Sequence, residues 1–153
     1  MLSPRRKPWS GNEQGNHRSR GKNPEKQGGK EQGYCVLALM DLDGYPTAAT
    51  ISPSKIEGIR RISFCTGTES NWAKRIQNCS RASVCFNSPE YNITLVGEIQ
   101  VLTDPEIKKE MWYGGMGYYF KGPEDPDYCV LQFVTKRYSL MLNEENGSAR
   151  GEL

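Results

Sequence analysis

Between residues 34 and 142 the chain alternates short apolar, β-branched segments with turn-forming residues, and this alternation constrains the fold more than any other feature. Runs of this length and composition predict short β-strands. Seven strands are predicted, over residues 34–40, 45–52, 62–66, 82–86, 92–102, 129–134 and 137–142. Two short helices are too few for parallel strands joined by helical crossovers. The predicted fold class is therefore mainly β: an antiparallel, closed or partly closed barrel of six to seven strands with two short flanking helices.

Local signals predict how individual strands begin, bend and end. Residues 41–44 read Asp-Leu-Asp-Gly, which predicts a hairpin turn with Gly44 at positive φ. Gly97 lies in the middle of the long strand 92–102 and predicts a bulge or bend there. The continuous apolar run at 34–40 is typical of a strand buried on both faces.

The two helices are predicted at residues 71–78 and 105–112. Ser70 is a suitable N-cap for the first helix. The second is preceded by Thr-Asp-Pro-Glu at 103–106, which fits a capping box with Pro105 at an early helical position. The Gly pair at 114–115 is expected to end it.

Charge sets the first boundary in the chain, near residue 33. Residues 1–33 hold eight basic and three acidic residues and little apolar surface, so this segment is predicted to be a disordered basic tail. A nucleic-acid-binding arm is the less favoured interpretation, because the basic residues are scattered among Glu. Residues 34–142 form the predicted globular domain, and residues 143–153 a flexible C-terminal tail.

Composition excludes several classes of protein. No apolar run is long enough for a membrane span, and no apolar segment follows the basic N-terminus as a secretory signal requires. Five cysteines without a C-x-x-C pair and a single histidine disfavour a metal site and His-based catalysis. This cysteine usage fits a reducing, cytoplasmic location. Cys65 and Cys85 lie in apolar strands and are expected to be inert core residues.

The segment from 64 to 75 has the most candidate ligand-binding groups, because a strand, a polar turn and a helix start follow one another there. Free backbone N–H groups at a helix N-terminus suit a phosphate. Thr66, Thr68 and Ser70 add hydroxyl groups, and Lys55 and Lys74 could add positive charge. An ordinary capped helix with a solvated basic face explains the same residues equally well.

Several motifs, in this order, resemble the pyridoxamine 5′-phosphate oxidase-like family of FMN-binding split barrels, and most closely its general-stress-protein branch. The matching motifs are Asp-Gly-Tyr-Pro at 43–46, Phe-Cys-Thr at 64–66 with the helix start at 70–75, the strands at 81–86 and 95–98, and Tyr-Tyr-Phe at 118–120 followed by Gly-Pro-Glu-Asp-Pro-Asp-Tyr at 122–128. The resemblance covers about 110 residues.

The resemblance implies a set of cofactor-binding residues around a flavin phosphate. They are Lys55, Cys65, Thr66, Ser70, Asn71, Trp72, Lys74 and Asn92. Cys65 would contact the ring or ribityl chain through its backbone, and Asn92 would place its amide near the flavin. Read from the residues alone, Asn92 is a strand-start residue with a solvated side chain. Asn71 and Trp72 replace a basic pair that the family often has, so FMN could bind weakly or a deazaflavin could take its place.

The implied function is an FMN-dependent oxidoreductase acting on an unknown small-molecule substrate or reductant, with no catalytic side chain assigned. The alternative is a non-catalytic stress-response protein that binds a flavin or deazaflavin. The resemblance also implies a homodimer with the flavin at the subunit interface. The aromatic residues of the chain at 72, 112 and 118–120 are expected to lie mostly in the core or in that interface.

Overall fold

The computed structural model describes residues 33–142 and 147–153, which belong to one compact unit. The predicted disordered tail at 1–33 lies outside the described residues except for Gly33. In the described part of the chain, no helix has the length and apolar character needed to cross a membrane.

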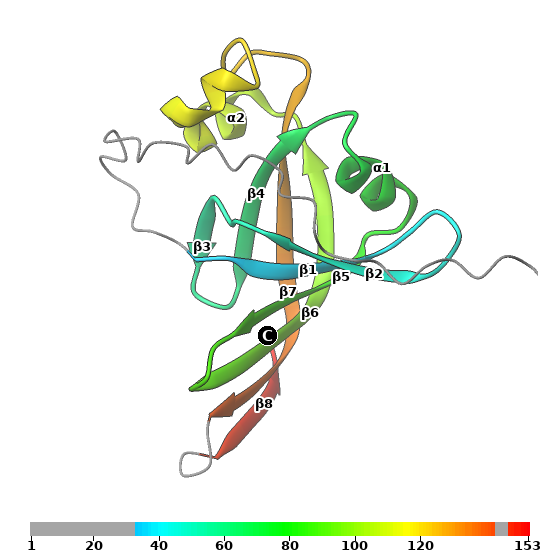
Figure 1. Ribbon diagram of the computed structural model, residues 1–153, viewed down its shortest axis with the longest axis vertical. Coiled ribbons are helices and arrows are strands. Elements are labelled where there is room, and N and C mark those ends of the chain that lie inside the picture. Colours follow the sequence, from blue (N-terminus) through cyan, green and yellow to red (C-terminus); the bar gives the residue numbers. More distant parts are fainter. Residues whose placement is uncertain (1–32, 143–146) are drawn as a thin grey trace, which may run out of the picture. The chain divides into compact units, whose positions relative to one another are not determined.

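Eight antiparallel strands and two α-helices make up the described fold (Figure 1). In chain order the elements are β1 (Cys35–Met40), β2 (Pro46–Ile51), β3 (Lys55–Glu57), β4 (Arg61–Gly67), α1 (Asn71–Asn78), β5 (Arg81–Asn87), β6 (Tyr91–Leu102), α2 (Pro105–Met111), the 3₁₀ helix η1 (Gly114–Tyr118), β7 (Tyr128–Leu142) and β8 (Ser148–Glu152). The sheet order is β2-β1-β5-β6-β7-β4-β3, with β8 paired to β7. The mainly β, antiparallel fold class with two short helices is therefore confirmed.

The strand predictions differ from the structure in three places. The two predicted strands at 129–134 and 137–142 are one strand, β7, because the same backbone continues from its pairing with β4 to its pairing with β8. The short strand β3 was not predicted. Ser148–Glu152 form β8 where the sequence predicted a flexible tail, because β7 offers these residues a backbone ladder that no local pattern reveals.

The first hairpin forms as the sequence predicts. Its two strands pair from Met40 opposite Pro46 onward, and Gly44 in the turn has φ +86°. The Asp41 carboxylate fixes the turn by accepting the N–H groups of Asp43 at 2.9 Å and Tyr45 at 2.8 Å. On β1 only alternate residues are fully buried, so the prediction of burial on both faces is wrong for this strand.

The predicted irregularity at Gly97 is also present. The register between β6 and β7 shifts between Val96 and Gly97, which leaves Lys136 as an extra residue in β7. A Cβ atom at Gly97 would overlap the carbonyl oxygen of Val134. Glycine is therefore required here by the close approach of the β7 backbone.

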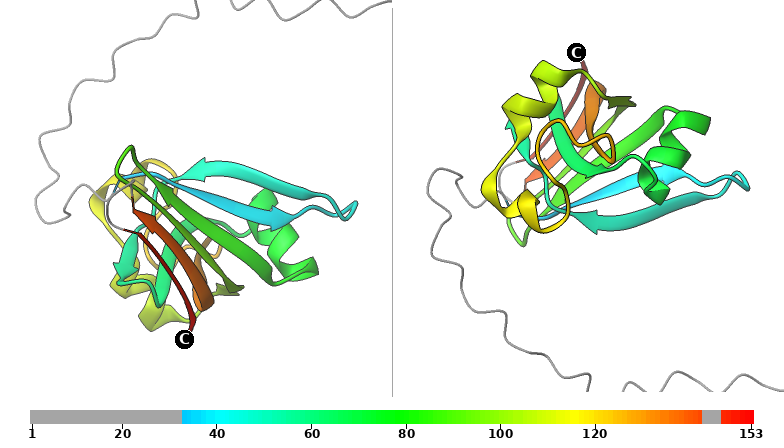
Figure 2. Two further views of the ribbon diagram at one scale, coloured as in Figure 1. Left: turned by 90° about the horizontal axis from the view of Figure 1, so that it is seen from below. Right: turned by 90° about the horizontal axis from the view of Figure 1, so that it is seen from above.

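Strands from distant places in the sheet order share one core, so the sheet curls around it (Figure 2). Leu37 from β1 and Phe64 from β4 belong to the same buried cluster, together with Ala73 and Ile76 of α1. We found no pairing between β2 and β3, the two ends of the sheet, within the described residues, so the barrel is open. The face toward this core is the inner face of the sheet.

The outer face carries a second, smaller cluster under α2. Along β7, Cys129 and Leu131 enter the main core, whereas Tyr128 and Val130 pack with Ile107 and other residues of the α2 region. The two helices therefore cover opposite faces of the sheet. This alternation decides which predicted site residues can meet.

Both helices have side-chain N-caps. Ser70 caps α1 as predicted, accepting the Ala73 N–H at 3.2 Å. For α2 the cap is Asp104 rather than Thr103, and its carboxylate accepts the N–H groups of Glu106 and Ile107. Pro105 follows at the first helical position, where the N–H that proline lacks would have no partner within the helix.

Candidate functional site

The candidate site lies where β4 ends and α1 begins. β3 pairs with β4 only up to Ser63, so from Phe64 to Gly67 the strand pairs, among the residues that the structure describes, with β7 alone. The turn that follows closes with a hydrogen bond from the Ser70 N–H to the Gly67 carbonyl at 3.0 Å. An open strand edge therefore leads directly into a helix N-terminus.

The first amides of α1 are available to a ligand. Ser70 caps the helix through Ala73, but in the residues that the structure describes the N–H groups of Asn71 and Trp72 have no hydrogen-bond acceptor. Two such groups at the positive end of a helix form an anion-binding arrangement. Thr66 and Ser70 carry hydroxyl groups on either side of this turn.

The turn before α1 is fixed by a second loop. The Thr68 N–H donates to the Asp127 carbonyl at 2.9 Å, and the Thr68 hydroxyl donates to the Pro126 carbonyl at 3.4 Å. Thr68 therefore acts as an anchor of the turn. Its hydroxyl is occupied by the protein rather than directed at a ligand.

The structure does not bring the predicted cations together. Lys55 faces the same side of the sheet as Ser63, the outer face, whereas Thr66 pairs with Cys129 and faces the inner side. The Lys55 ammonium donates to Glu110 of α2 at 2.6 Å, and this carboxylate raises the pKa of Lys55. Strand alternation thus separates Lys55 from the start of α1.

Lys74 and Arg75 lie on α1 itself. The Lys74 ammonium is 3.5 Å from Glu69, and both side chains are at least half exposed. Arg75 turns the other way and donates to the Thr47 hydroxyl of β2 at 3.2 Å. Lys74 is therefore the cation of the predicted set that belongs to the same turn-and-helix segment as the free amides.

Two of the predicted cofactor-binding side chains, those of Trp72 and Cys65, contact other parts of the protein. Trp72 is partly buried, and its side chain packs against the main core. The Cys65 thiol points to the outer face, 3.6 Å from the Tyr128 hydroxyl and 3.8 Å from the Met111 carbonyl. Burial raises the pKa of Cys65, which keeps the thiol protonated. This agrees with the predicted inert side chain and leaves the Cys65 backbone on the open edge of β4.

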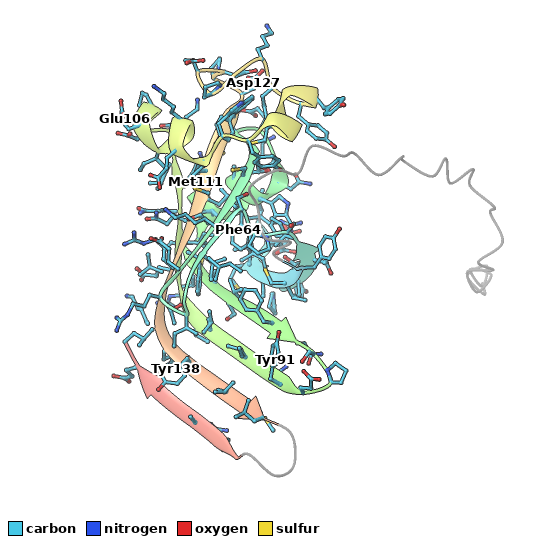
Figure 3. All side chains as sticks on the ribbon, turned by 90° about the vertical axis from the view of Figure 1, so that its left-hand side faces the viewer. Phe64, Tyr91, Glu106, Met111, Asp127 and Tyr138 are labelled. Carbon is cyan, nitrogen blue, oxygen red and sulfur yellow. The ribbon has the colours of Figure 1, made fainter. Side chains whose placement is uncertain are left out.

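Asn92 lies far from these residues. Its amide donates to the Cys85 thiol at 3.6 Å, and its carbonyl oxygen accepts the Thr94 hydroxyl at 3.3 Å, so the side chain is bound within the sheet rather than freely solvated. Leu102, which packs in the cluster beside Cys65, is ten residues farther along β6, or about 30 Å at the usual rise of a strand. Figure 3 shows Tyr91, the neighbour of Asn92, at the opposite end of the sheet from Asp127.

The sequence between residues 26 and 142 matches the model of the family described as pyridoxamine 5'-phosphate oxidase. The chain belongs to this family. A comparison with curated proteins gave no match.

Solved structures with the same fold include general stress proteins of this oxidase family. The protein related to general stress protein 26 from Clostridium acetobutylicum superposes with a TM-score of 0.66 at 21% identity, over 78% of this chain and 85% of that one. General stress protein 26 from Bacillus anthracis gives 0.64 at 19%, over 80% and 90%. A pyridoxamine 5'-phosphate oxidase-related, FMN binding protein from Nostoc punctiforme gives 0.66 at 16%, over 76% and 78%.

The remaining aromatics of this family member divide between core and surface. Trp112 and Phe120 pack around the Tyr128 ring, at centroid distances of 5.5 and 5.3 Å. Tyr118 and Tyr119 expose 81% and 74% of their surface. Trp112 and Phe120 are therefore core aromatics as expected, whereas Tyr118 and Tyr119 are exposed in this chain and their place in an interface stays a prediction.

Sequence reasoning missed a buried polar network beneath α2. Lys108 is 6% exposed, and its ammonium donates to the Asp125 carbonyl at 2.7 Å. The Tyr128 hydroxyl donates to the Lys108 carbonyl at 3.0 Å. The only signal in the sequence is the polar Asp-Pro-Asp turn directly before the apolar start of β7, which could equally be solvent-facing.

Proposed function

We propose that this chain binds FMN, with the phosphate at the N-terminus of α1. The observation that carries the proposal is the pair of unpartnered amides at Asn71 and Trp72, set between hydroxyl groups at the open end of β4. Membership of the pyridoxamine 5'-phosphate oxidase family and the FMN binding relative from Nostoc punctiforme support the choice of a flavin.

The hydrogen-bond donors at the start of α1 suit a phosphate, and one of the two predicted lysines, Lys74, lies close enough in the chain to add positive charge. Backbone amides and hydroxyls are common phosphate donors, and Lys74 lies one turn into the helix. Its ion pair with Glu69 is exposed, and such pairs are worth only about 0–1 kcal/mol, so a phosphate can compete for the ammonium. Lys55 would contribute little, because its pairing with Ser63 turns its side chain to the outer face, away from α1.

A homodimer follows from the position of Asn92, if this residue contacts the flavin. In one chain, Asn92 and the Cys65 region are about 30 Å apart along β6, farther than one flavin reaches. Both can line one site only when the far end of β6 comes from a second copy. The exposed Tyr118 and Tyr119 supply aromatic surface for such an isologous contact.

A bound FMN would supply hydride-transfer chemistry, and the chain's own residues would hold and orient it. The open edge of β4 would contact the flavin through backbone groups, and α1 would hold its phosphate. The two candidate functions are an oxidoreductase with a small-molecule substrate and a non-catalytic flavin-binding stress-response protein. Bleaching of the flavin absorption of the purified protein on addition of NADH or NADPH would favour the oxidoreductase.

Titration of FMN and riboflavin by fluorescence quenching tests the phosphate position. Lys74→Met should weaken FMN about ten- to a hundredfold if the ammonium makes a charge-assisted contact, and should leave riboflavin unchanged. Lys55→Met is the matched control and should leave both flavins unchanged. Loss of FMN affinity in Lys55→Met alone would place the phosphate on the outer face and refute the site at α1.

Mixing two variants that each bind FMN poorly tests whether two copies of the chain share a site. Asn92→Ala and Lys74→Met should each bind FMN poorly as pure proteins. If each site combines α1 of one copy with Asn92 of the other, a random equal mixture restores about a quarter of the sites, because half the dimers are mixed and each holds one intact site. No recovery on mixing, with a stable monomer by sedimentation, would refute the shared site.

A further inference from the structure

A loop far from α1 in sequence holds the turn that begins it. Residues 121–127, the acidic loop, connect η1 to β7, and two of their carbonyl groups accept the N–H and hydroxyl of Thr68. The Thr68 N–H bond to the Asp127 carbonyl joins the two backbones directly, and a Cβ atom added at Gly67 would lie 3.5 Å from the same oxygen. The conformation of residues 67–70 therefore depends on where the acidic loop lies.

The acidic loop is in turn held by Asp125. Its carboxylate accepts the N–H of Lys121 at 2.7 Å and that of Asp127 at 2.9 Å, and these two bonds hold the pKa of Asp125 below its usual range. Its backbone carbonyl accepts both the Lys108 ammonium and the Tyr128 N–H. One residue thus ties the loop to itself, to β7 and to α2.

Lys108 is the buried member of this arrangement. It is 6% exposed, and its ammonium lies 5.3 Å from the centre of the ring of Tyr128, which belongs to the buried cluster with Met116 and Val130. Burying a cation among apolar side chains is unfavourable, and here the hydrogen bond and the aromatic ring compensate. An apolar residue could fill the same space without this cost, but it could not hold the Asp125 carbonyl.

We propose that Lys108 is a positioning residue for the phosphate site: by binding the Asp125 carbonyl it clamps the acidic loop, and the loop fixes the Thr68 turn whose helix presents the free amides. This role rests on the proposed FMN function. The contacts run from Lys108 through Asp125 and Asp127 to Thr68. If the clamp is lost and the turn is correctly formed only a tenth of the time, FMN affinity falls about tenfold.

The experiment compares three variants by FMN and riboflavin titration. Lys108→Met keeps the apolar stem and removes the ammonium, and Asp125→Asn weakens the loop without touching α2. Both should lose about tenfold in FMN affinity and stay within about twofold for riboflavin, because only the phosphate uses the turn. Gly97→Ala is the control: it destabilises the fold between β6 and β7, where Gly97 pairs with Thr135, and it changes no residue of α2 or of the acidic loop, so it should bind both flavins like the wild type.

Hydrogen exchange at the Thr68 amide reports the clamp without any flavin. This amide should exchange at least about tenfold faster in Lys108→Met and Asp125→Asn than in the wild type, and at the wild-type rate in Gly97→Ala. Unchanged exchange or unchanged FMN affinity in Lys108→Met would overturn the role of Lys108 and leave the FMN function standing. Equal losses in Gly97→Ala would overturn it too, because general stability would then explain the effect. Failure of the wild-type chain to bind FMN would overturn the function and this role together.

Discussion

Replacement of Gly97 by Ala should destabilise the fold more than a single methyl group normally does. The added Cβ atom would overlap the carbonyl oxygen of Val134 and lie 2.9 Å from its carbonyl carbon and 3.0 Å from the Cα of Thr135. All three atoms belong to the backbone of β7, so no side chain can rotate away. The two longest strands of the sheet must separate at the point where their register already shifts.

Overpacking of a well-packed interior costs about 1–3 kcal/mol, and each ladder hydrogen bond lost to the separation adds about 1 kcal/mol. We therefore expect Gly97→Ala to lower the free energy of unfolding by about 3 kcal/mol. With a urea m-value of about 2 kcal/mol/M, the midpoint of unfolding should fall by about 1.5 M.

The matched control is Gly117→Ala in η1, where a Cβ atom would meet nothing within 4 Å. Its unfolding free energy should stay within about 0.5 kcal/mol of the wild-type value. Both variants are measured by urea unfolding followed by circular dichroism. A Gly97→Ala midpoint equal to that of the control would refute the close approach of β6 and β7.

Three further predictions concern caps, pH and thiols. Asp104→Ala should lower the unfolding free energy by about 1 kcal/mol in the same urea assay, because the carboxylate caps two amides of α2. The pKa of Asp125 is depressed, so the contribution of its carboxylate to stability is complete above the ordinary carboxyl pKa of about 4 and is lost as the pH falls below it. The difference in unfolding free energy between wild type and Asp125→Asn should therefore shrink from pH 6 to pH 3. Burial raises the pKa of Cys35 and of Cys129 to about 11. In the native protein at pH 8 these two thiols should therefore not react with Ellman's reagent, whereas the half-buried Cys79 should. Rapid labelling of Cys129 would contradict its burial.

The sequence by itself determined the features whose physical cause lies within a few residues. The helix at Asn71–Asn78 was predicted with its bounds and with Ser70 as its cap, because a hydroxyl reaches the amide three residues on. The turn at Gly44 and the irregularity at Gly97 were predicted because glycine tolerates a positive φ and a close backbone. The mainly β class followed from the alternation of short strands and turns.

Only the tertiary structure decided which of these local features meet. β8 exists because β7 offers it a ladder, and one continuous β7 replaces two predicted strands for the same reason. Lys55 was predicted beside the phosphate, but the parity of its pairing with Ser63 turns it to the outer face, where Glu110 lies. The link from Lys108 to Asp125 joins residues 17 apart through a buried contact, and no local periodicity encodes such a pairing. Hydrogen bonds and ion pairs between distant segments depend on register and on which face each strand presents, and these are fixed only when the whole sheet has formed.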